Sequence, residues 1–115
     1  MYVDKVKNIK SVKLEAPGIA NVLKRVLVGP QQGWEGWVMR HFTLGAAGYT
    51  PRHTHLWPHI IYILSGNGTL LLGEKEHEVK TGSTAYIPGG AEHQFRNPAG
   101  EDFSFICIVP EEGDV

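Results

Sequence analysis

Glycine and proline divide this chain into segments that are too short for long helices. These residues form turns because glycine accepts positive φ, and proline fixes φ and lacks a backbone N–H donor. The clearest breaks are Pro17-Gly18, Gly29-Pro30, Ser65-Gly66-Asn67-Gly68, Pro88-Gly89-Gly90 and Asn97-Pro98-Ala99-Gly100. A further glycine-rich stretch at residues 45–48 is expected to end the strand before it.

The segments between the breaks are typical of β-strands. Most are rich in β-branched and aromatic residues, and several alternate between apolar and polar positions. No convincing amphipathic helix is present. The predicted strands are residues 12–14, 22–28, 37–44, 60–64, 69–72, 76–80, 84–87, 92–96 and 103–109. Eight or nine strands at this spacing predict an all-β sandwich or small barrel, which can hold a ligand in its mouth.

Length and charge limit the classes of function. At 115 residues the chain is predicted to form one domain. The net charge is −1 and there is no basic run, which argues against a nucleic-acid partner. No apolar run approaches the roughly 20 residues of a membrane span, so no membrane partner is expected. The N-terminus does not resemble a signal peptide, and Cys107 is the only cysteine, so a cytoplasmic location is predicted.

Three histidines lie close together between the two apolar strands that end and begin near residues 44 and 60. His53, His55 and His59 are spaced i, i+2 and i+6, which places them on one face of an extended chain but not of a helix. Pro51 and Pro58 also argue against a helix here. Neutral imidazole is the commonest protein ligand for transition metals. This stretch therefore predicts a metal site.

A second segment strengthens that prediction, because its spacing resembles the second motif of the cupin superfamily. Gly82 is followed by five residues, Pro88, one residue, Gly90, two residues, His93, three residues and Asn97. The earlier histidine stretch resembles the first cupin motif, and 15 residues separate Gly66, where that motif ends, from Gly82. The resemblance implies a single-domain cupin β-barrel (double-stranded β-helix or jelly roll) over residues 1–115. The N-terminal strands would lie in 1–36 and the barrel motifs within 37–110.

The chain departs from the usual first motif at two positions. Ala47 stands where the opening glycine is normally found, with Gly48 directly after it, and His59 stands where glutamate is usual. The resemblance therefore implies a four-histidine metal site, similar to the small manganese-binding bacterial cupins, with His53, His55, His59 and His93 as ligands. One divalent ion per chain is expected, but four nitrogens do not select strongly among Mn, Fe, Ni, Cu and Zn. A degenerate cupin that keeps the shape and loses the metal is the alternative.

Strand alternation suggests which side chains surround the site. Phe95 is in phase with His93, Ile61 is in phase with His59, and Phe105 and Cys107 share a face that the cupin arrangement would turn inward. Trp57 lies between two of the predicted ligands. Cys107 could be a ligand, a redox partner, a pocket wall or only a small buried hydrophobe.

The predicted pocket is apolar and contains no acid or base besides the histidines. This favours a metal-dependent dioxygenase acting on a small apolar or aromatic substrate. The main alternative is a non-catalytic cupin that binds or senses a small molecule, and a metal-assisted isomerase or cyclase is less favoured. Catalytic residues beyond the ligands are not predicted.

A homodimer is expected as well. Small barrels leave sheet edges that must be covered. The N-terminal segment through Leu14 and the strand at residues 22–28 are the predicted contacts across a two-fold axis.

Overall fold

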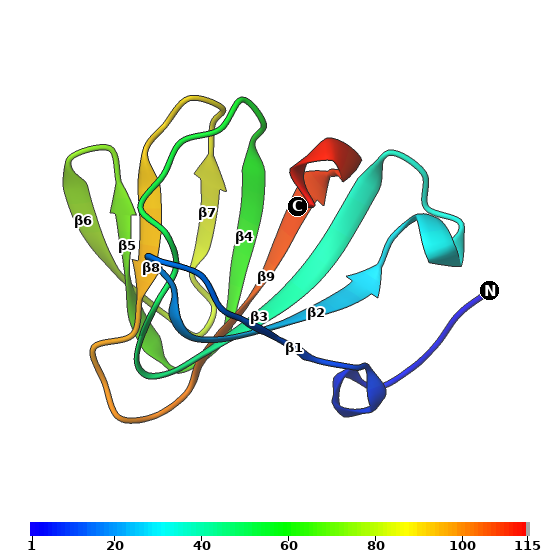
Figure 1. Ribbon diagram of the computed structural model, residues 1–115, viewed down its shortest axis with the longest axis horizontal. Coiled ribbons are helices and arrows are strands. Elements are labelled where there is room, and N and C mark those ends of the chain that lie inside the picture. Colours follow the sequence, from blue (N-terminus) through cyan, green and yellow to red (C-terminus); the bar gives the residue numbers. More distant parts are fainter. Residues whose placement is uncertain (115) are drawn as a thin grey trace.

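The computed structural model describes residues 1–114, and nine antiparallel strands make up most of it (Figure 1). The all-β class predicted from the sequence is confirmed. Short 3-10 turns accompany the strands at Val6–Asn8 (η1), Pro30–Gln32 (η2) and Glu111–Gly113 (η3). The strands are β1 (Val12–Leu14), β2 (Ala20–Val28), β3 (Trp37–Tyr49), β4 (His59–Ser65), β5 (Asn67–Leu72), β6 (Lys75–Lys80), β7 (Thr84–Ile87), β8 (His93–Arg96) and β9 (Phe103–Pro110).

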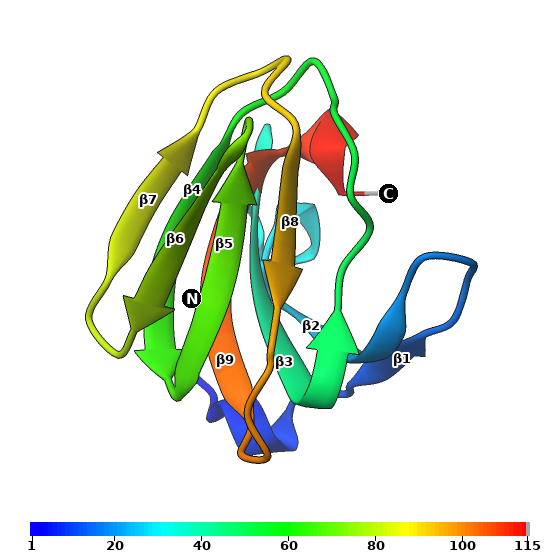
Figure 2. The same cartoon turned by 90° about the vertical axis from the view of Figure 1, so that its left-hand side faces the viewer.

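The strands pair in the order β6-β5-β8-β3-β9-β4-β7, and β2 and β1 continue the sheet from β3. The sheet curls so that β5, β6 and β8 face the layer made by β3, β4 and β9 (Figure 2). Strand β3 is long enough to serve both layers. It pairs with β2 and β9 along most of its length and with β8 only through Tyr49 and Arg96.

The core lies between the layers and follows the alternation of the strands. In β4 the side chains of His59, Ile61 and Ile63 point inward and are buried, whereas Ile60 and Tyr62 are exposed. Strands β3 and β9 keep one register, so that inward residues of one strand lie beside inward residues of the other. These pairs are Val38 with Val109, Arg40 with Cys107, Phe42 with Phe105 and Leu44 with Phe103.

Strand β3 does not end where the sequence predicted. The glycine-rich stretch at residues 45–48 continues the strand as far as Tyr49, which pairs with Ala20. Its register with β2 is irregular there, and Ala47 takes φ +59°. The prediction was wrong because local sequence does not show which distant residues hydrogen-bond to this part of the backbone. Asn97 is buried, and its side-chain amide donates to the carbonyl oxygens of Leu44 and Gly45 at 2.9 and 3.0 Å.

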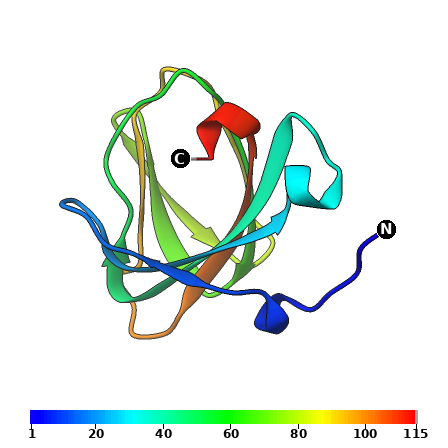
Figure 3. The same cartoon turned by 45° about the vertical axis from the view of Figure 1, so that its right-hand side comes forward.

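The chain returns to one open end of the barrel at η3 (Figure 3). Gly113 packs against the indole of Trp57 so closely that a Cβ there would lie 2.7 Å from Cδ1 of the ring. Asp114 follows, with Oδ1 2.6 Å from Nζ of Lys24 and 3.8 Å from an Nη atom of Arg40. This end of the barrel is the one that carries the predicted ligands. None of the helical turns in the described part of the chain has the length and apolar character needed to cross a bilayer.

Candidate metal centre

The four predicted ligands come from two kinds of backbone. His59 opens β4 and His93 opens β8, and both side chains are buried. His53 and His55 lie in the irregular segment between β3 and β4. That segment is tied to β8 by a bridge in which His53 and His93 exchange backbone N–H···O hydrogen bonds of 3.2 and 3.0 Å. Two histidines are thus held by strands and two by a loop.

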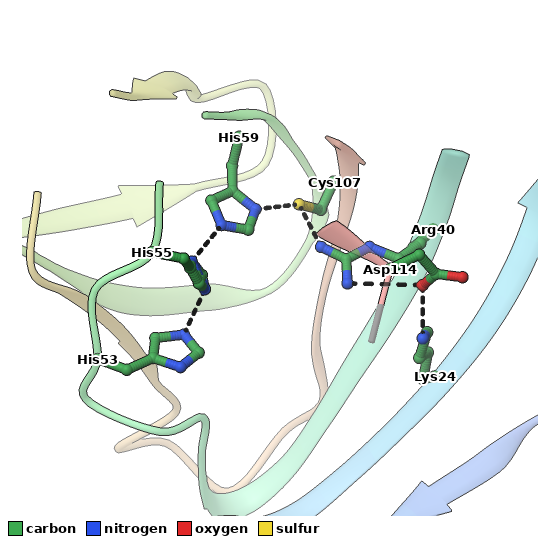
Figure 4. Close-up of polar contacts among 7 residues, drawn as sticks. All are labelled: Lys24, Arg40, His53, His55, His59, Cys107 and Asp114. Atoms are coloured by element: carbon green, nitrogen blue, oxygen red, sulfur yellow. Dashed lines mark hydrogen bonds and ion pairs between the residues drawn. The ribbon is translucent and has the colours of Figure 1, made fainter. Parts of the chain in front are cut away.

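The rings of these histidines gather at one place, and Figure 4 draws three of them, those of His53, His55 and His59. Ligand atoms of His53, His55 and His93 all lie within 4.8 Å of one another. The two Nε2 atoms of His53 and His55 are 3.2 Å apart, and Nε2 of His59 is 3.4 Å from Nδ1 of His55. The His59 ring also lies 4.9 Å from the ring of His93, centroid to centroid.

The nitrogen separations of 3.2 and 3.4 Å are each of the size that two ligands of one ion require. Two nitrogens that bind one ion at about 2.1 Å lie about 3.0 to 3.4 Å apart, for bond angles between a right angle and the tetrahedral angle. His53, His55 and His93 form the compact group. His59 faces the ring of His55 from the other side, and a single ion would use only one of the two His55 nitrogens.

Hydrogen bonds to protein atoms orient two of the rings. Nδ1 of His93 lies 3.0 Å from the carbonyl oxygen of Ala91, which can only accept, so Nδ1 carries the proton and Nε2 keeps its lone pair. Nδ1 of His59 lies 3.1 Å from Sγ of Cys107, and its Nε2 faces the other histidines. The carbonyl oxygen fixes the tautomer of His93, whereas the thiol, which can donate or accept, fixes only the direction of the His59 ring.

The site keeps its imidazoles neutral. Burial lowers the pKa of His59 to about 3, and the charges of His93 and Arg40 act in the same direction. Burial, together with His93 and His55, lowers the pKa of His53 to about 4. The pKa values of His55 and His93 are lowered too, mainly by burial. Neutral imidazole is the form that binds metal.

A cavity of about 160 Å³ opens beside the histidines. Of the side chains predicted to surround the site, Phe95, Phe105 and Cys107 line it. Ile61 lies in the packed core instead, and Trp57 stacks on the ring of His55, with centroids 4.8 Å apart. The cavity is lined by Leu14, Ile19, Arg40, Phe42, Thr50, Pro51, His53, His55, His59, His93, Phe95, Phe105, Cys107 and Gly113.

Arg40 is the residue that sequence reasoning missed. Its side chain is buried, with an exposed fraction of 6%, and one guanidinium nitrogen donates to Sγ of Cys107 at 3.1 Å. The sulfur thus joins Arg40 to His59, and Asp114 joins Arg40 to Lys24 (Figure 4). Strand alternation could have identified it, because Arg40 is in phase with Val38 and Phe42 and therefore points inward with them.

The remaining two histidines lie apart from the cluster. His77 is exposed on β6. His41 is buried on β3 between Arg25 and Ile106, its strand neighbours, and burial lowers its pKa. Neither residue lines the cavity.

The residues present fit a bound metal ion. A group of neutral nitrogens at ligand spacing, two of them oriented by outer partners, is the arrangement of a transition-metal site. Three or four histidines would leave coordination positions free, which is the open arrangement of a reactive site and not of a structural one.

Known proteins resemble this chain in sequence or in fold. The chain is 36% identical over 76 residues to 1-methylthio-D-xylulose 5-phosphate methylsulfurylase of Rhodospirillum rubrum, an alignment that covers 66% of this chain and 49% of that protein. It is 30% identical over 76 residues to auxin-binding protein 1 of Arabidopsis thaliana, with 58% of this chain and 38% of that protein covered. The chain thus spans half or less of the length of these two relatives.

A solved structure extends the likeness over nearly the whole chain. The polyketide cyclase RemF of Streptomyces resistomycificus superposes with a TM-score of 0.89 and 29% identity, covering 96% of this chain and 79% of that one. Residues 40–109, more than half of the chain, match the sequence profile of the family described as "Cupin domain". The strand order, the histidine cluster and this match agree: the chain belongs to the cupin domain family.

Proposed function

We propose that the protein is a metal-dependent enzyme that binds a small apolar or aromatic compound through an oxygen-bearing group and activates it. The observation that carries this proposal is the cavity, where a cluster of neutral histidines meets a wall of phenylalanines. His53, His55 and His93 would hold the ion, with His59 as the fourth ligand that the sequence predicts. A divalent ion bound there would supply Lewis-acid polarisation of a substrate oxygen.

The chain's own side chains would bind and orient the substrate. The rings of Phe95 and Phe105 stack with centroids 4.2 Å apart, and Phe42 lies 5.5 Å from Phe105. This aromatic wall offers an apolar, flat-sided surface that excludes water and favours planar ligands. The substrate would therefore lie with its apolar part on the phenylalanines and its oxygen toward the histidines.

Two kinds of reaction fit this arrangement. The dioxygenase-like activity predicted from the sequence would add oxygen atoms to the substrate. Cyclisation would rearrange it, and the 29% identity to the polyketide cyclase RemF supports this second candidate. The metal proposed includes manganese and iron as well as nickel, copper and zinc, because nitrogen ligands do not distinguish strongly among them.

A non-catalytic role is the proposal from a different class. The similarity to auxin-binding protein 1 supports it, since that name describes binding of a small molecule. The same cavity would then hold an effector without changing it.

One set of measurements separates these functions. The protein is loaded in turn with manganese, iron and zinc and offered diketones, phenols and linear polyketide analogues. Oxygen uptake with products of increased mass indicates a dioxygenase, and oxygen-independent products that equal the substrate, or the substrate less water, indicate a cyclase. Saturable binding without any product supports the binding module. A protein that holds no metal after loading would contradict the proposed metal-dependent enzyme.

A further inference from the structure

The cavity wall contains a buried positive charge. Arg40 is the only Lys or Arg residue among the described residues that line the cavity, and the described lining contains no carboxylate. Its guanidinium carbon lies 4.9 Å from the centre of the Phe42 ring, so the charge is held over the aromatic wall. A charge on a buried side chain acts more strongly on a ligand than an exposed one, because solvent screens it less.

The partners of Arg40 compensate its charge only in part. Within residues 1–114, Asp114 is the only acidic residue at ion-pair distance, at 3.8 Å, and it lies closer to Lys24, at 2.6 Å. One carboxylate thus serves two cations. Cys107 contributes a sulfur atom as acceptor, and burial raises the pKa of its thiol. The group of Lys24, Arg40 and Asp114 therefore brings a net positive charge to the cavity wall.

Arg40 also has an unused donor. Its Nε is buried and has no hydrogen-bond partner among the described residues. Buried donors in folded proteins are nearly always paired with protein, ordered water or a ligand. The side chain that carries this donor is 94% buried and lines the cavity.

The volume of the cavity and the position of Arg40 in its wall limit which ligands can bind there. An apolar cavity of about 150 Å³ is large enough to hold benzene, and this cavity measures about 160 Å³. A ligand there can reach the histidine cluster and Arg40 together, because all of these side chains line the same cavity and one sulfur atom, Sγ of Cys107, lies 3.1 Å from both Nδ1 of His59 and the guanidinium. Its polar group would thus lie within reach of both the predicted metal ligands and a cation.

We propose that Arg40 selects the charge of the substrate: the cavity takes a small planar compound that carries one negative charge, a carboxylate or an enolate. The anionic group lies between the histidine cluster and the guanidinium, and the ring lies on the phenylalanine wall. This inference names the substrate class for the proposed function, and it rests on that function for the reaction that follows binding. The preference for a negative charge itself requires no metal.

The test compares benzoate with benzamide, which has the same ring and shape but no charge. Both are titrated calorimetrically into the metal-free protein and into the zinc-loaded protein. We expect benzoate to bind about tenfold or more tightly than benzamide in both forms, as a charge-assisted hydrogen bond in a dry site would give. Equal affinity for the two ligands, or no binding of either, would overturn the proposal, and this arm requires no variant.

Variants then assign the preference to one residue. Arg40→Gln is expected to lower the affinity for benzoate to about that for benzamide, whereas Arg40→Lys retains most of the preference. Arg25→Gln is the matched control. It removes the same charge from the neighbouring strand, where the Arg25 side chain donates to the carbonyl oxygen of Ile9 and does not line the cavity. Melting curves verify that each variant is folded.

Different results would refute the inference about Arg40 and the proposed metal-dependent function. A preference for benzoate that persists in the metal-free Arg40→Gln protein would assign the charge selection elsewhere and refute the inference; the metal-free form decides this, because a bound zinc ion attracts a carboxylate by itself. A protein that prefers benzoate through Arg40 but retains no metal would refute the metal-dependent enzyme and leave the inference standing.

Discussion

At the scale of single residues, His59 decides whether the centre has three or four protein ligands. His53, His55 and His93 form the compact group, and His59 faces it from beside Cys107. If His59 is a ligand, His59→Ala should weaken metal binding by more than the roughly 10- to 100-fold that loss of an outer partner causes. Metal titration monitored by calorimetry measures this.

Two further variants serve as the positive and negative controls for that measurement. His93→Ala removes a member of the compact group and should abolish tight binding. His77→Ala removes an exposed histidine from β6 and should change nothing. If His59→Ala binds metal as tightly as the parent, the four-histidine assignment is wrong and a three-histidine centre remains.

Ala47 is a residue under backbone strain. Its φ of +59° lies in the left-handed region, which costs a residue with a Cβ about 1–2 kcal/mol. Ala47→Gly relieves this but makes the unfolded chain more flexible, so a net gain of about 0.5–1 kcal/mol is expected. Denaturant unfolding measures it. Ala46→Gly, the exposed neighbour without positive φ, should lose stability instead, and the prediction fails if both variants are destabilised.

At the scale of elements, Asn97 ties the connection between β8 and β9 to strand β3. Its side-chain nitrogen donates to the carbonyl oxygens of Leu44, Gly45 and Glu101, at 2.9, 3.0 and 2.7 Å, and its oxygen accepts from the backbone of Ala99. Asn97→Ala should therefore cost about 2–4 kcal/mol, because it leaves buried carbonyl groups unpaired. The exposed Asn67→Ala is the control in the same unfolding assay. A loss below about 1 kcal/mol would show that water replaces the side chain.

Sequence reasoning reached the strands and the histidines because both depend on local spacing. Turn residues mark the ends of strands, and alternation gives the inward faces, as the burial of Ile61, Ile63 and Phe95 shows. Local pattern could not show that Asn97 satisfies the backbone at residues 45–48 from half the chain away. It also could not show that Asp114 and Cys107 stabilise a buried Arg40, because these partners meet only in the folded barrel.

At the scale of the whole molecule, the lowered histidine pKa values link stability to pH. The unfolded chain takes up protons on these imidazoles near pH 6.5, whereas folded His53 and His59 do so only near pH 4 and 3. Between these limits the folded state binds fewer protons, so the metal-free protein should lose stability as pH falls. The slope is at most about 1.4 kcal/mol per pH unit for the buried His59, and it is smaller for His53, because that side chain is exposed and solvent screens its interactions.

This dependence is measured as the free energy of unfolding between pH 7 and 4. His59→Gln removes one of the groups and should flatten the curve relative to the parent, which separates the histidine contribution from that of the carboxylates. Parallel curves for the two proteins would contradict the lowered pKa of His59. Proton competition with metal should likewise begin at a lower pH than an ordinary imidazole would give.

The predicted homodimer remains to be tested. Val12, Leu23 and Val26, on the strands expected to form the contact, have exposed fractions of 52%, 37% and 39%. Ile60, Tyr62 and Tyr86 form a second exposed apolar group on β4 and β7. Sedimentation of the parent, Val26→Glu and Tyr62→Glu should give a dimer that only Val26→Glu dissociates. A monomeric parent at micromolar concentration would refute the dimer, and dissociation by Tyr62→Glu alone would move the contact to the second group.

The division of the ligands between strands and loop has a consequence for how an ion would enter. His59 and His93 are fixed at the starts of β4 and β8, whereas His53 and His55 lie on an irregular segment, which is held by the His53–His93 bridge and by hydrogen bonds of Thr50 to β8 and of His55 to Gly90. An arriving ion would meet a preformed half-site first, and the loop would close over it afterwards. We expect release to be slower than uptake, because the ion loses two of its ligands only when this segment moves away from β8. The dissociation rate of the bound metal would then depend on the sequence of residues 50–58 as much as on the ligands themselves.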